Sequence, residues 1–468
     1  MTKAREYLLF IGFFVSIMAL SLSYIYIFGN PRVSYDGWQY LSSAKAIVTN
    51  TLPENYFWVR QPGYSLFIAF SSVISQSLWF VFGAQVFIFS LAYTLFVYEC
   101  KRHIMKPSLR EYFFLAFINF VFVLVFVGGY FIILTPQALT GAYLLLLTTG
   151  ILRVWRIFKS IEIIEKFERK VTQVIFVYLF FPLMCVIGFC LSTFIGVLPI
   201  VCLLIFFGMA TREHIKSSDN LNFEVIKTLS VWILPIILSV FAFLSIFQLW
   251  LNLSTHALSD VNFNDSNLQD PFWGGGISSY ITNIKLDPEL LHYIPASFLA
   301  LLMLIPNQGW NGVAVERTLN SHSQNGDIGF GLFSSNYASC VSNPPEVLVV
   351  SNSFIKDFLW RDTCAFTGWD LPIIVFIPIF SLWVVLCTIW IANLFRGNDT
   401  FLRIASIPVL LFLGAYSFFG GGIDRYGSSA YPIIIFLASF TSLEFLRNNS
   451  IGLRKSSRKL NAQNKSIF

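Results

Sequence analysis

Residues 7–28 read YLLFIGFFVSIMALSLSYIYIF, an apolar run without a single charge. About 20 such residues are enough for a helix to cross a hydrocarbon core of about 30 Å, so this run predicts a membrane-spanning helix. It is longer than the apolar core of a signal peptide, and no small-residue cleavage pattern follows it. We therefore expect this segment to be a permanent membrane span.

The composition extends this interpretation to the whole chain. Of its 468 residues, 56% are hydrophobic and only 12% are charged, which excludes a soluble globule with a polar shell. The sequence predicts an all-α polytopic membrane protein of about ten transmembrane helices. The other nine apolar runs lie at 77–99, 109–128, 131–152, 172–191, 194–211, 228–250, 371–395, 403–420 and 428–446.

The distribution of Lys and Arg predicts the orientation. Most of the 31 basic residues fall before residue 7, in alternate connections between the runs, or after residue 446, and such positions face the cytoplasm. Both termini are then cytoplasmic, and segments 29–76 and 251–370 lie outside. The apolar stretch 290–306 would invert every later connection if it crossed the membrane, so we expect an interfacial or re-entrant helix there.

These expectations divide the chain into four regions. Residues 1–250 form an N-terminal transmembrane module whose first outer loop spans 29–76, and 251–370 form one large extracytoplasmic loop. Residues 371–446 form a C-terminal transmembrane module, and 447–468 are a basic cytoplasmic tail. The net charge of +6 comes mostly from that tail and the inner connections, and it indicates no nucleic-acid partner.

The first outer loop contains DGWQY at residues 36–40 and RQPGYSLF at residues 60–67. A carboxylate such as Asp36 can act as a general base, especially where burial raises its pKa. The planar guanidinium of Arg60 matches phosphate oxygens, and Pro62 and Gly63 can fix the turn that directs it. Two other interpretations stay open: Asp36 caps a helix that starts at Gly37, and Arg60 reaches lipid headgroups.

The order of a span, an acidic residue with a nearby Tyr, a short amphipathic helix and then basic-x-Pro-Gly-Tyr resembles the GT-C superfamily. These are polytopic membrane glycosyltransferases that use polyprenyl-phosphate sugar donors, among them protein O-mannosyltransferases, the aminoarabinose transferase of lipid A and transferases that decorate O-antigen. A second similar stretch is Arg425-Tyr426, followed by Pro432 and an apolar run. The resemblance implies that Asp36 is catalytic and that Arg60, Arg425 and Tyr426 bind the donor phosphate.

One position departs from the family pattern. Where many members carry an acidic residue at the outer start of a span, this chain reads Leu134-Thr135-Pro136-Gln137. Gln137 cannot titrate, so we expect a metal-independent site without cofactor, in which Gln137, Tyr40 and Tyr64 contact the sugar or the acceptor. Asp260, Asp265 and Asp270 in the large loop are too widely spaced for a familiar metal loop.

The resemblance implies an inverting glycosyltransferase of the bacterial inner membrane whose active site faces the periplasm. It would move a sugar from a polyprenyl-phosphate carrier to a glycan or lipid-linked acceptor, as in lipopolysaccharide O-antigen of the cell envelope. Membrane lipid is its other partner. Two alternatives remain: an O-antigen polymerase or ligase, which Arg317, His322 and Arg361 of the large loop allow, and a lipid-linked glycan flippase, whose half-repeats are not evident.

Two cysteines fall in the large loop and the others lie in or next to apolar runs. Cys340 and Cys364 are plausible disulfide partners outside the cytoplasm, although spacing alone does not show that they meet. Cysteines within the runs are expected to be small buried hydrophobic residues; these are Cys185, Cys190, Cys202 and Cys387.

Overall fold

The computed structural model describes most of the apolar part of the chain. The described residues are 3–28, 35–49, 62–75, 77–103, 108–127, 134, 136–161, 167–217, 233–249, 295, 298–299, 302, 373–396, 400–418 and 427–442. They are almost entirely helical and contain no strand. The longer helices are α1 (Lys3–Phe28), α4 (Leu78–His103), α5 (Leu109–Val127), α7 (Gln137–Ile161), α8 (Phe167–Leu191), α9 (Thr193–Ser217), Ile233–Leu249, α15 (Ile373–Arg396), α16 (Thr400–Phe418) and Ser428–Ser442, which opens with the 3-10 turn η4 (Ser428–Ala430).

Each of the ten predicted apolar runs overlaps one of these helices. By length and composition, four of the described helices can cross a membrane: Ala4–Ile27, Leu78–His103, Gln137–Ile157 and Thr400–Ser417. The helical fold class and a membrane-embedded protein are therefore confirmed. The full count of ten crossings stays a prediction.

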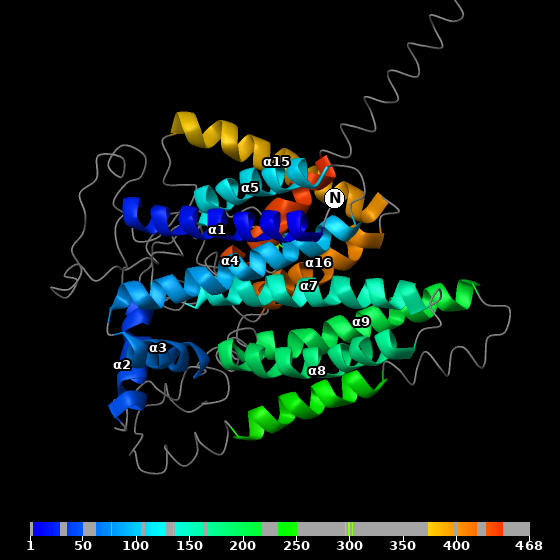
Figure 1. Ribbon diagram of the computed structural model, residues 1–468, viewed down its shortest axis with the longest axis horizontal. Coiled ribbons are helices and arrows are strands. Elements are labelled where there is room, and N and C mark those ends of the chain that lie inside the picture. Colours follow the sequence, from blue (N-terminus) through cyan, green and yellow to red (C-terminus); the bar gives the residue numbers. More distant parts are fainter. Residues whose placement is uncertain are drawn as a thin grey trace, which may run out of the picture.

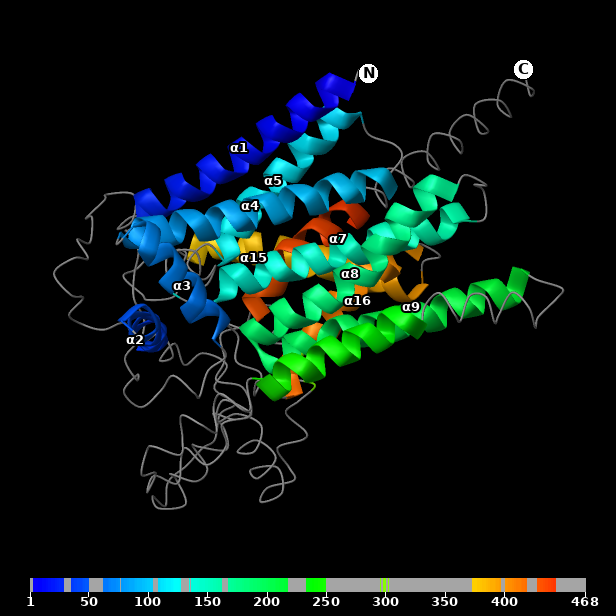
Figure 2. The same cartoon turned by 60° about the horizontal axis from the view of Figure 1, so that its bottom comes forward.

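The helices lie side by side as a bundle with two distinct ends (Figure 1). Two shorter helices, α2 (Tyr35–Thr49) and α3 (Gly63–Ile74), pack against each other at one end, and α1 begins at the other. A second view shows the same separation (Figure 2). We call these the α2–α3 end and the N-terminal end. Helices α4 and α7 run in the same direction through the middle of the bundle and pack closely along their length.

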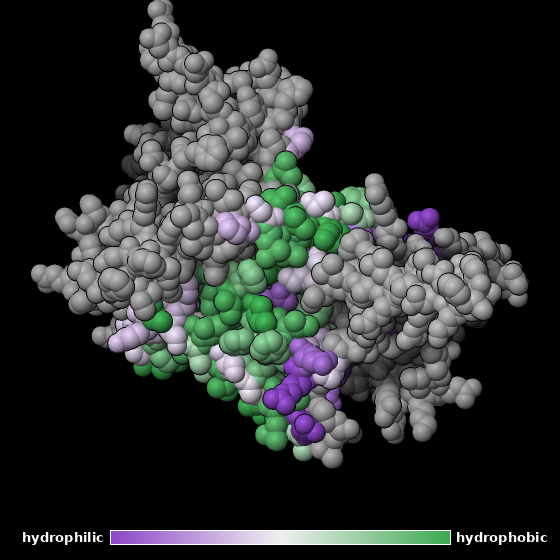
Figure 3. Space-filling view, turned by 90° about the horizontal axis from the view of Figure 1, so that it is seen from above, coloured by the Kyte–Doolittle hydropathy of each residue, from purple (hydrophilic) through white to green (hydrophobic). Residues whose placement is uncertain are grey.

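The outer surface of the bundle is apolar. Large hydrophobic side chains such as Leu8 and Ile11 of α1 and Phe114 of α5 are exposed, at 70%, 55% and 63% of their maximum. Figure 3 shows one face of the molecule on which described apolar residues cover a broad area and hydrophilic residues gather near one edge. Such a surface is stable against lipid tails but not against water.

Proline and tyrosine together shape the α8–α9 hairpin, in which only Ser192 separates the two helices. Pro199 lies inside α9 and has no N–H, so the carbonyl of Ile195, four residues earlier, loses its helical partner. The buried hydroxyl of Tyr143 in α7 lies 3.1 Å from that carbonyl and 3.0 Å from the carbonyl of Met184 in α8. Tyr143 therefore satisfies the backbone oxygen that the proline exposes and ties both helices to α7.

Part of the predicted interfacial stretch 290–306 contacts the bundle. Pro295, Phe298, Leu299 and Leu302 are helical, and the rest of the stretch lies outside the described residues. Leu302 is buried, and its carbonyl accepts a hydrogen bond of 2.9 Å from the hydroxyl of Tyr431. This part of the large loop is thus seated on the first turns of the last helix.

Candidate active site

Two tyrosines from the first outer loop form the centre of the candidate site. The ring centroids of Tyr40 in α2 and Tyr64 in α3 lie 4.9 Å apart, and the ring planes are perpendicular. This edge-to-face arrangement is the favoured geometry for aromatic pairs. Tyr64 is 1% exposed and Tyr40 is 7% exposed, so the pair is almost dry. The contact joins the DGWQY helix to the PGY helix.

Gln85 of α4 anchors this pair to the bundle. The hydroxyl of Tyr64 donates a hydrogen bond to Oε1 of Gln85 at 3.3 Å, which is long for an O–H···O bond. Gln85 is itself buried. Burial, and in second place the neighbouring Tyr40, raises the pKa of the Tyr64 phenol well above its usual value. Tyr64 therefore keeps its proton and remains a hydrogen-bond donor.

The start of α3 is fixed by the residues predicted to form a turn. Pro62 is the N-cap residue, in the αR conformation, and its carbonyl accepts a hydrogen bond of 2.7 Å from the N–H of Leu66. Gly63 packs so closely on α8 that an added Cβ would overlap the carbonyl of Cys190 and come within 2.7 Å of its Cβ. Only glycine permits this approach. The Pro-Gly pair thus starts a helix and seats it on α8.

Gln137 lies at the same end of the bundle, on the neighbouring helix. It is the first residue of α7 and is 7% exposed, and its carbonyl accepts a hydrogen bond of 3.1 Å from the hydroxyl of Ser429. Oε1 of Gln137 is buried and has no hydrogen-bond partner among the described residues. A buried acceptor in this state is costly unless a ligand or water serves it. Gln137 therefore has an unused acceptor.

Gln85 of α4 and Gln137 of α7 lie at the same level of the bundle. Contacts one helical turn further along both helices show this. A Cβ at Gly141 would lie 3.1 Å from the ring of Phe89 and 3.4 Å from the carbonyl of Ser429. Gly141 follows Gln137 by four residues, and Phe89 follows Gln85 by four residues on a helix that runs in the same direction. The structure thus joins Tyr40 to Tyr64 directly, while the polar contact of Gln137 is with Ser429.

The predicted charged residues are described only in part. Asp36 is the second residue of α2, which begins at Tyr35 and not at Gly37, so Asp36 lies inside the first turn instead of at the capping position. Its side chain lies outside the described residues, as do Arg60, Arg425 and Tyr426. Their predicted roles stay predictions.

Most of the large loop is also outside the described residues, including Cys340, Cys364 and the three aspartates. The described cysteines are all free; Cys100, Cys185, Cys202 and Cys387 are buried, and Cys190 is half-buried. Within the described part of the chain, no group of three His, Cys, Asp or Glu side chains is arranged to hold a metal. Metal independence stays a prediction.

Sequence reasoning did not single out Gln85 or Ser429. A signal for Gln85 was present, because a polar amide within the apolar run 77–99 is unusual enough to suggest a defined partner. Ser429 follows Arg425-Tyr426 by three residues, but nothing in the sequence relates it to Gln137.

Comparison of the chain with protein-family models, with curated proteins and with solved structures finds no match.

Proposed function

We propose that this protein is an integral membrane glycosyltransferase that moves a sugar from a polyprenyl-phosphate carrier to an extracytoplasmic glycan or lipid-linked acceptor. One observation carries the proposal. Tyr40 of the DGWQY stretch and Tyr64 of the PGY stretch pack ring to ring, at 4.9 Å, on the end of α4. The two parts of the first outer loop that carry the GT-C resemblance therefore belong to one structural unit, which supports a shared site.

In the proposed reaction, Asp36 accepts the proton of an acceptor hydroxyl. The acceptor oxygen forms a bond to the anomeric carbon while the bond from that carbon to the carrier phosphate breaks, which inverts the configuration. The phosphate leaves as an anion, so it needs cations more than an acid. Arg60 and Arg425, with Tyr426, fill that role by bidentate and charge-assisted hydrogen bonds.

The buried polar groups have supporting roles in this scheme. Tyr64 is too buried to contact a sugar face, and we assign it as a positioning residue that holds α3 against Gln85. Tyr40 links α3 to the helix that carries Asp36. The unused Oε1 of Gln137 is suited to accept a hydrogen bond from a sugar hydroxyl.

The cellular context is part of the same proposal. We place the protein in a bacterial inner membrane with the site facing the periplasm, and we assign acceptor recognition to the 251–370 loop. Leu302 of that loop packs on the last helix, whose Ser429 contacts Gln137. These two contacts support a role for the loop in presenting an acceptor near Gln137.

The test is transfer from a radiolabelled polyprenyl-phosphate sugar in membranes that contain the protein. Asp36→Asn should lower the rate by roughly 10²–10⁴-fold, the usual contribution of a general base. Glu54→Gln is the matched control, because Glu54 is the other carboxylate of the first loop, and it should keep the wild-type rate. Asp36→Asn activity within a few-fold of wild type would refute the base.

Arg60 offers a second arm of the same experiment. Lys keeps the charge of Arg but loses its planar fork. Arg60→Lys should therefore retain part of the activity and Arg60→Ala almost none. Equal activity of the two variants would assign Arg60 to the lipid surface. No turnover with any polyprenyl-phosphate sugar, in membranes where the protein is inserted and folded, would favour a polymerase, a ligase or a transporter instead.

A further inference from the structure

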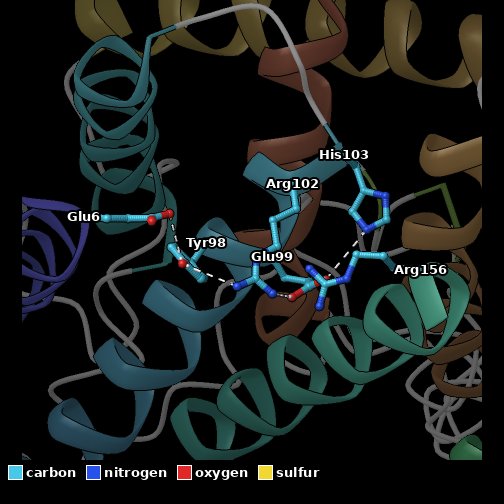
Figure 4. Close-up of polar contacts among 6 residues, drawn as sticks. All are labelled: Glu6, Tyr98, Glu99, Arg102, His103 and Arg156. Atoms are coloured by element: carbon cyan, nitrogen blue, oxygen red, sulfur yellow. Dashed lines mark hydrogen bonds and ion pairs between the residues drawn. The ribbon is translucent and has the colours of Figure 1, made fainter. Parts of the chain in front are cut away.

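A charged cluster occupies the opposite end of the bundle, around the buried carboxylate of Glu99 in α4 (Figure 4). Oε1 of Glu99 lies 3.1 Å from Nη1 of Arg156 in α7 and 3.8 Å from Nε2 of His103. Its Oε2 lies 3.5 Å from Nη1 of Arg102. The His103 ring also stacks on Phe401 of α16, with centroids 5.2 Å apart. One carboxylate thus joins α4 to α7 and is shared among several basic groups.

Arg153 adds a third guanidinium to this cluster. It precedes Arg156 by three residues and therefore lies on the same face of α7. Arg153 is exposed, its guanidinium carbon lies 4.4 Å from the ring centroid of Phe176 in α8, and it has no carboxylate partner among the described residues. Stacking of this kind holds the planar group in place while it leaves the N–H donors unused.

Arg102 is also only partly engaged. Its side chain is 42% exposed, and its bonds to Glu99 and to the hydroxyl of Tyr98 are 3.5 and 3.4 Å long, at the limit for hydrogen bonds. The nearby second carboxylate, Glu6 of α1, accepts a hydrogen bond of 3.1 Å from Tyr98. Among the described residues, Arg102 and Arg153 thus keep guanidinium N–H donors without an acceptor.

Counted over the described side chains, the cluster contains more positive charge than its carboxylates neutralise. Three arginines interact electrostatically with the buried carboxylate of Glu99, Glu6 is the other described carboxylate nearby, and like charges held close together repel unless an anion joins them. A guanidinium fork fits the oxygens of a phosphate group better than a single halide ion. The arrangement therefore favours a ligand that carries a phosphate.

The position of the cluster indicates which phosphate. It lies at the last turns of α4 and α7, and both of these helices are long and apolar enough to cross a membrane. Basic groups at the end of a membrane span face lipid headgroups, and basic pockets between spans bind anionic ones. We propose that Arg102, Arg153 and Arg156 form a binding site for the phosphate of an anionic phospholipid headgroup.

The test uses the purified full chain in a neutral detergent. The midpoint of thermal unfolding is measured while short-chain phosphatidylglycerol, short-chain phosphatidylcholine or inorganic phosphate is added. Phosphatidylglycerol should raise the midpoint with a saturable dose dependence. Phosphatidylcholine and millimolar inorganic phosphate should not. A saturable effect of inorganic phosphate equal to that of phosphatidylglycerol would show a soluble phosphate ligand and overturn the lipid assignment.

Variants identify the site. Arg102→Gln and Arg153→Gln should each weaken phosphatidylglycerol binding about fivefold, since one basic residue near an anionic surface contributes about 1 kcal/mol. Arg153→Lys should lie between wild type and Arg153→Gln, because it keeps the charge but loses the fork. Arg110→Gln is the control: Arg110 is an exposed arginine in the first turn of α5 and outside the cluster. Unchanged binding in the Arg102→Gln/Arg153→Gln double variant, or an equal loss in the Arg110→Gln control, would refute the site.

This outcome is independent of the proposed transferase activity. The three arginines lie in the last turns of α4 and α7, at the opposite end of the bundle from the two tyrosines of the candidate active site. The double variant is therefore expected to keep its transfer rate per folded molecule, while Asp36→Asn is expected to keep its response to phosphatidylglycerol.

Discussion

Helix α4 connects two polar sites of opposite character. Near its start, Gln85 takes a hydrogen bond from a neutral tyrosine inside a dry aromatic cluster. Near its end, Glu99 is shared among Arg156, Arg102 and His103, and positive charge is in excess among the described side chains. In the neutral pair, donor and acceptor bind each other within the protein, so the pair serves to position neighbouring groups. A cluster with surplus positive charge among its described side chains is suited to binding an anion.

The largest effect concerns which side of the membrane each end faces. In a background without Cys340 and Cys364, cysteines placed at Asn267 and Ser351 should both react with an impermeant thiol reagent added from outside. Cysteines at Ser160 and Ser456 should react only after the membrane is opened. Labelling of Asn267 and Ser351 from opposite sides would place Arg425 across the membrane from Asp36, and one site could not then contain both.

The second-largest effect is expected at the N-terminal end of the bundle, around Glu99. Glu99→Gln keeps the shape of the side chain but removes the charge that holds the arginines, and it should lower the free energy of unfolding by about 1–3 kcal/mol. The value is below the roughly 3–5 kcal/mol of a fully buried pair because Arg156 and Arg102 are partly exposed. Denaturation in detergent measures it.

Glu111→Gln is the control for this substitution. Glu111 accepts a hydrogen bond from the N–H of Ser108 at the start of α5, and a glutamine can replace it in that bond. Equal stability of the Glu99→Gln and Glu111→Gln variants would show that the cluster contributes no more than a surface group.

The third effect concerns the close packing of α3 on α8 at the α2–α3 end. Its disruption should change the free energy of unfolding by a similar or smaller amount. Gly63→Ala places a methyl group against the backbone of Cys190 and should destabilise the protein by about 1–3 kcal/mol, the usual cost of overpacking. Gly208→Ala is its control, because a Cβ there meets nothing within 4 Å and a helical alanine is favoured by about 1 kcal/mol. If Gly63→Ala, like Gly208→Ala, unfolds at or above the wild-type midpoint, α3 is not seated on α8.

The smallest effect is expected at Tyr64. Tyr64→Phe removes one long hydrogen bond and should cost about 0.5–1.5 kcal/mol at neutral pH. Burial raises the pKa of Tyr64 above that of the unfolded chain. The wild type is then unaffected below about pH 10 and loses stability above it, as the unfolded state ionises. Tyr64→Phe should lose less stability over that range. Parallel curves for the two proteins would show that Tyr64 is not buried in solution.

The helices could be predicted from the sequence because hydropathy is a local property. A run such as 77–99 must satisfy its backbone internally wherever it lies in a membrane, so it becomes α4 whatever its neighbours are. The proximity of Tyr40 and Tyr64 was expected from the GT-C resemblance, which rests on the order of DGWQY and PGY along the chain. Those inferences required no knowledge of which helix lies beside which.

The partners could not be predicted in the same way. Gln85 matters because α3 happens to pack on α4, and Gly63 matters because Cys190 of α8 approaches it. The sequence predicted only that the three arginines of the cluster, Arg102, Arg153 and Arg156, face the cytoplasm. Their convergence on Glu99 depends on the parallel course of α4 and α7, which no local pattern indicates.

The contact between Tyr143 and the α8–α9 hairpin bears on biogenesis. Ile195 enters the bilayer with a carbonyl that its own helix cannot pair, because Pro199 has no N–H to offer. Its partner, the hydroxyl of Tyr143, belongs to a helix that the ribosome completes earlier. Synthesis from the N-terminus thus delivers the acceptor after its donor is already in the membrane, and the hairpin can dock as it leaves the translocon.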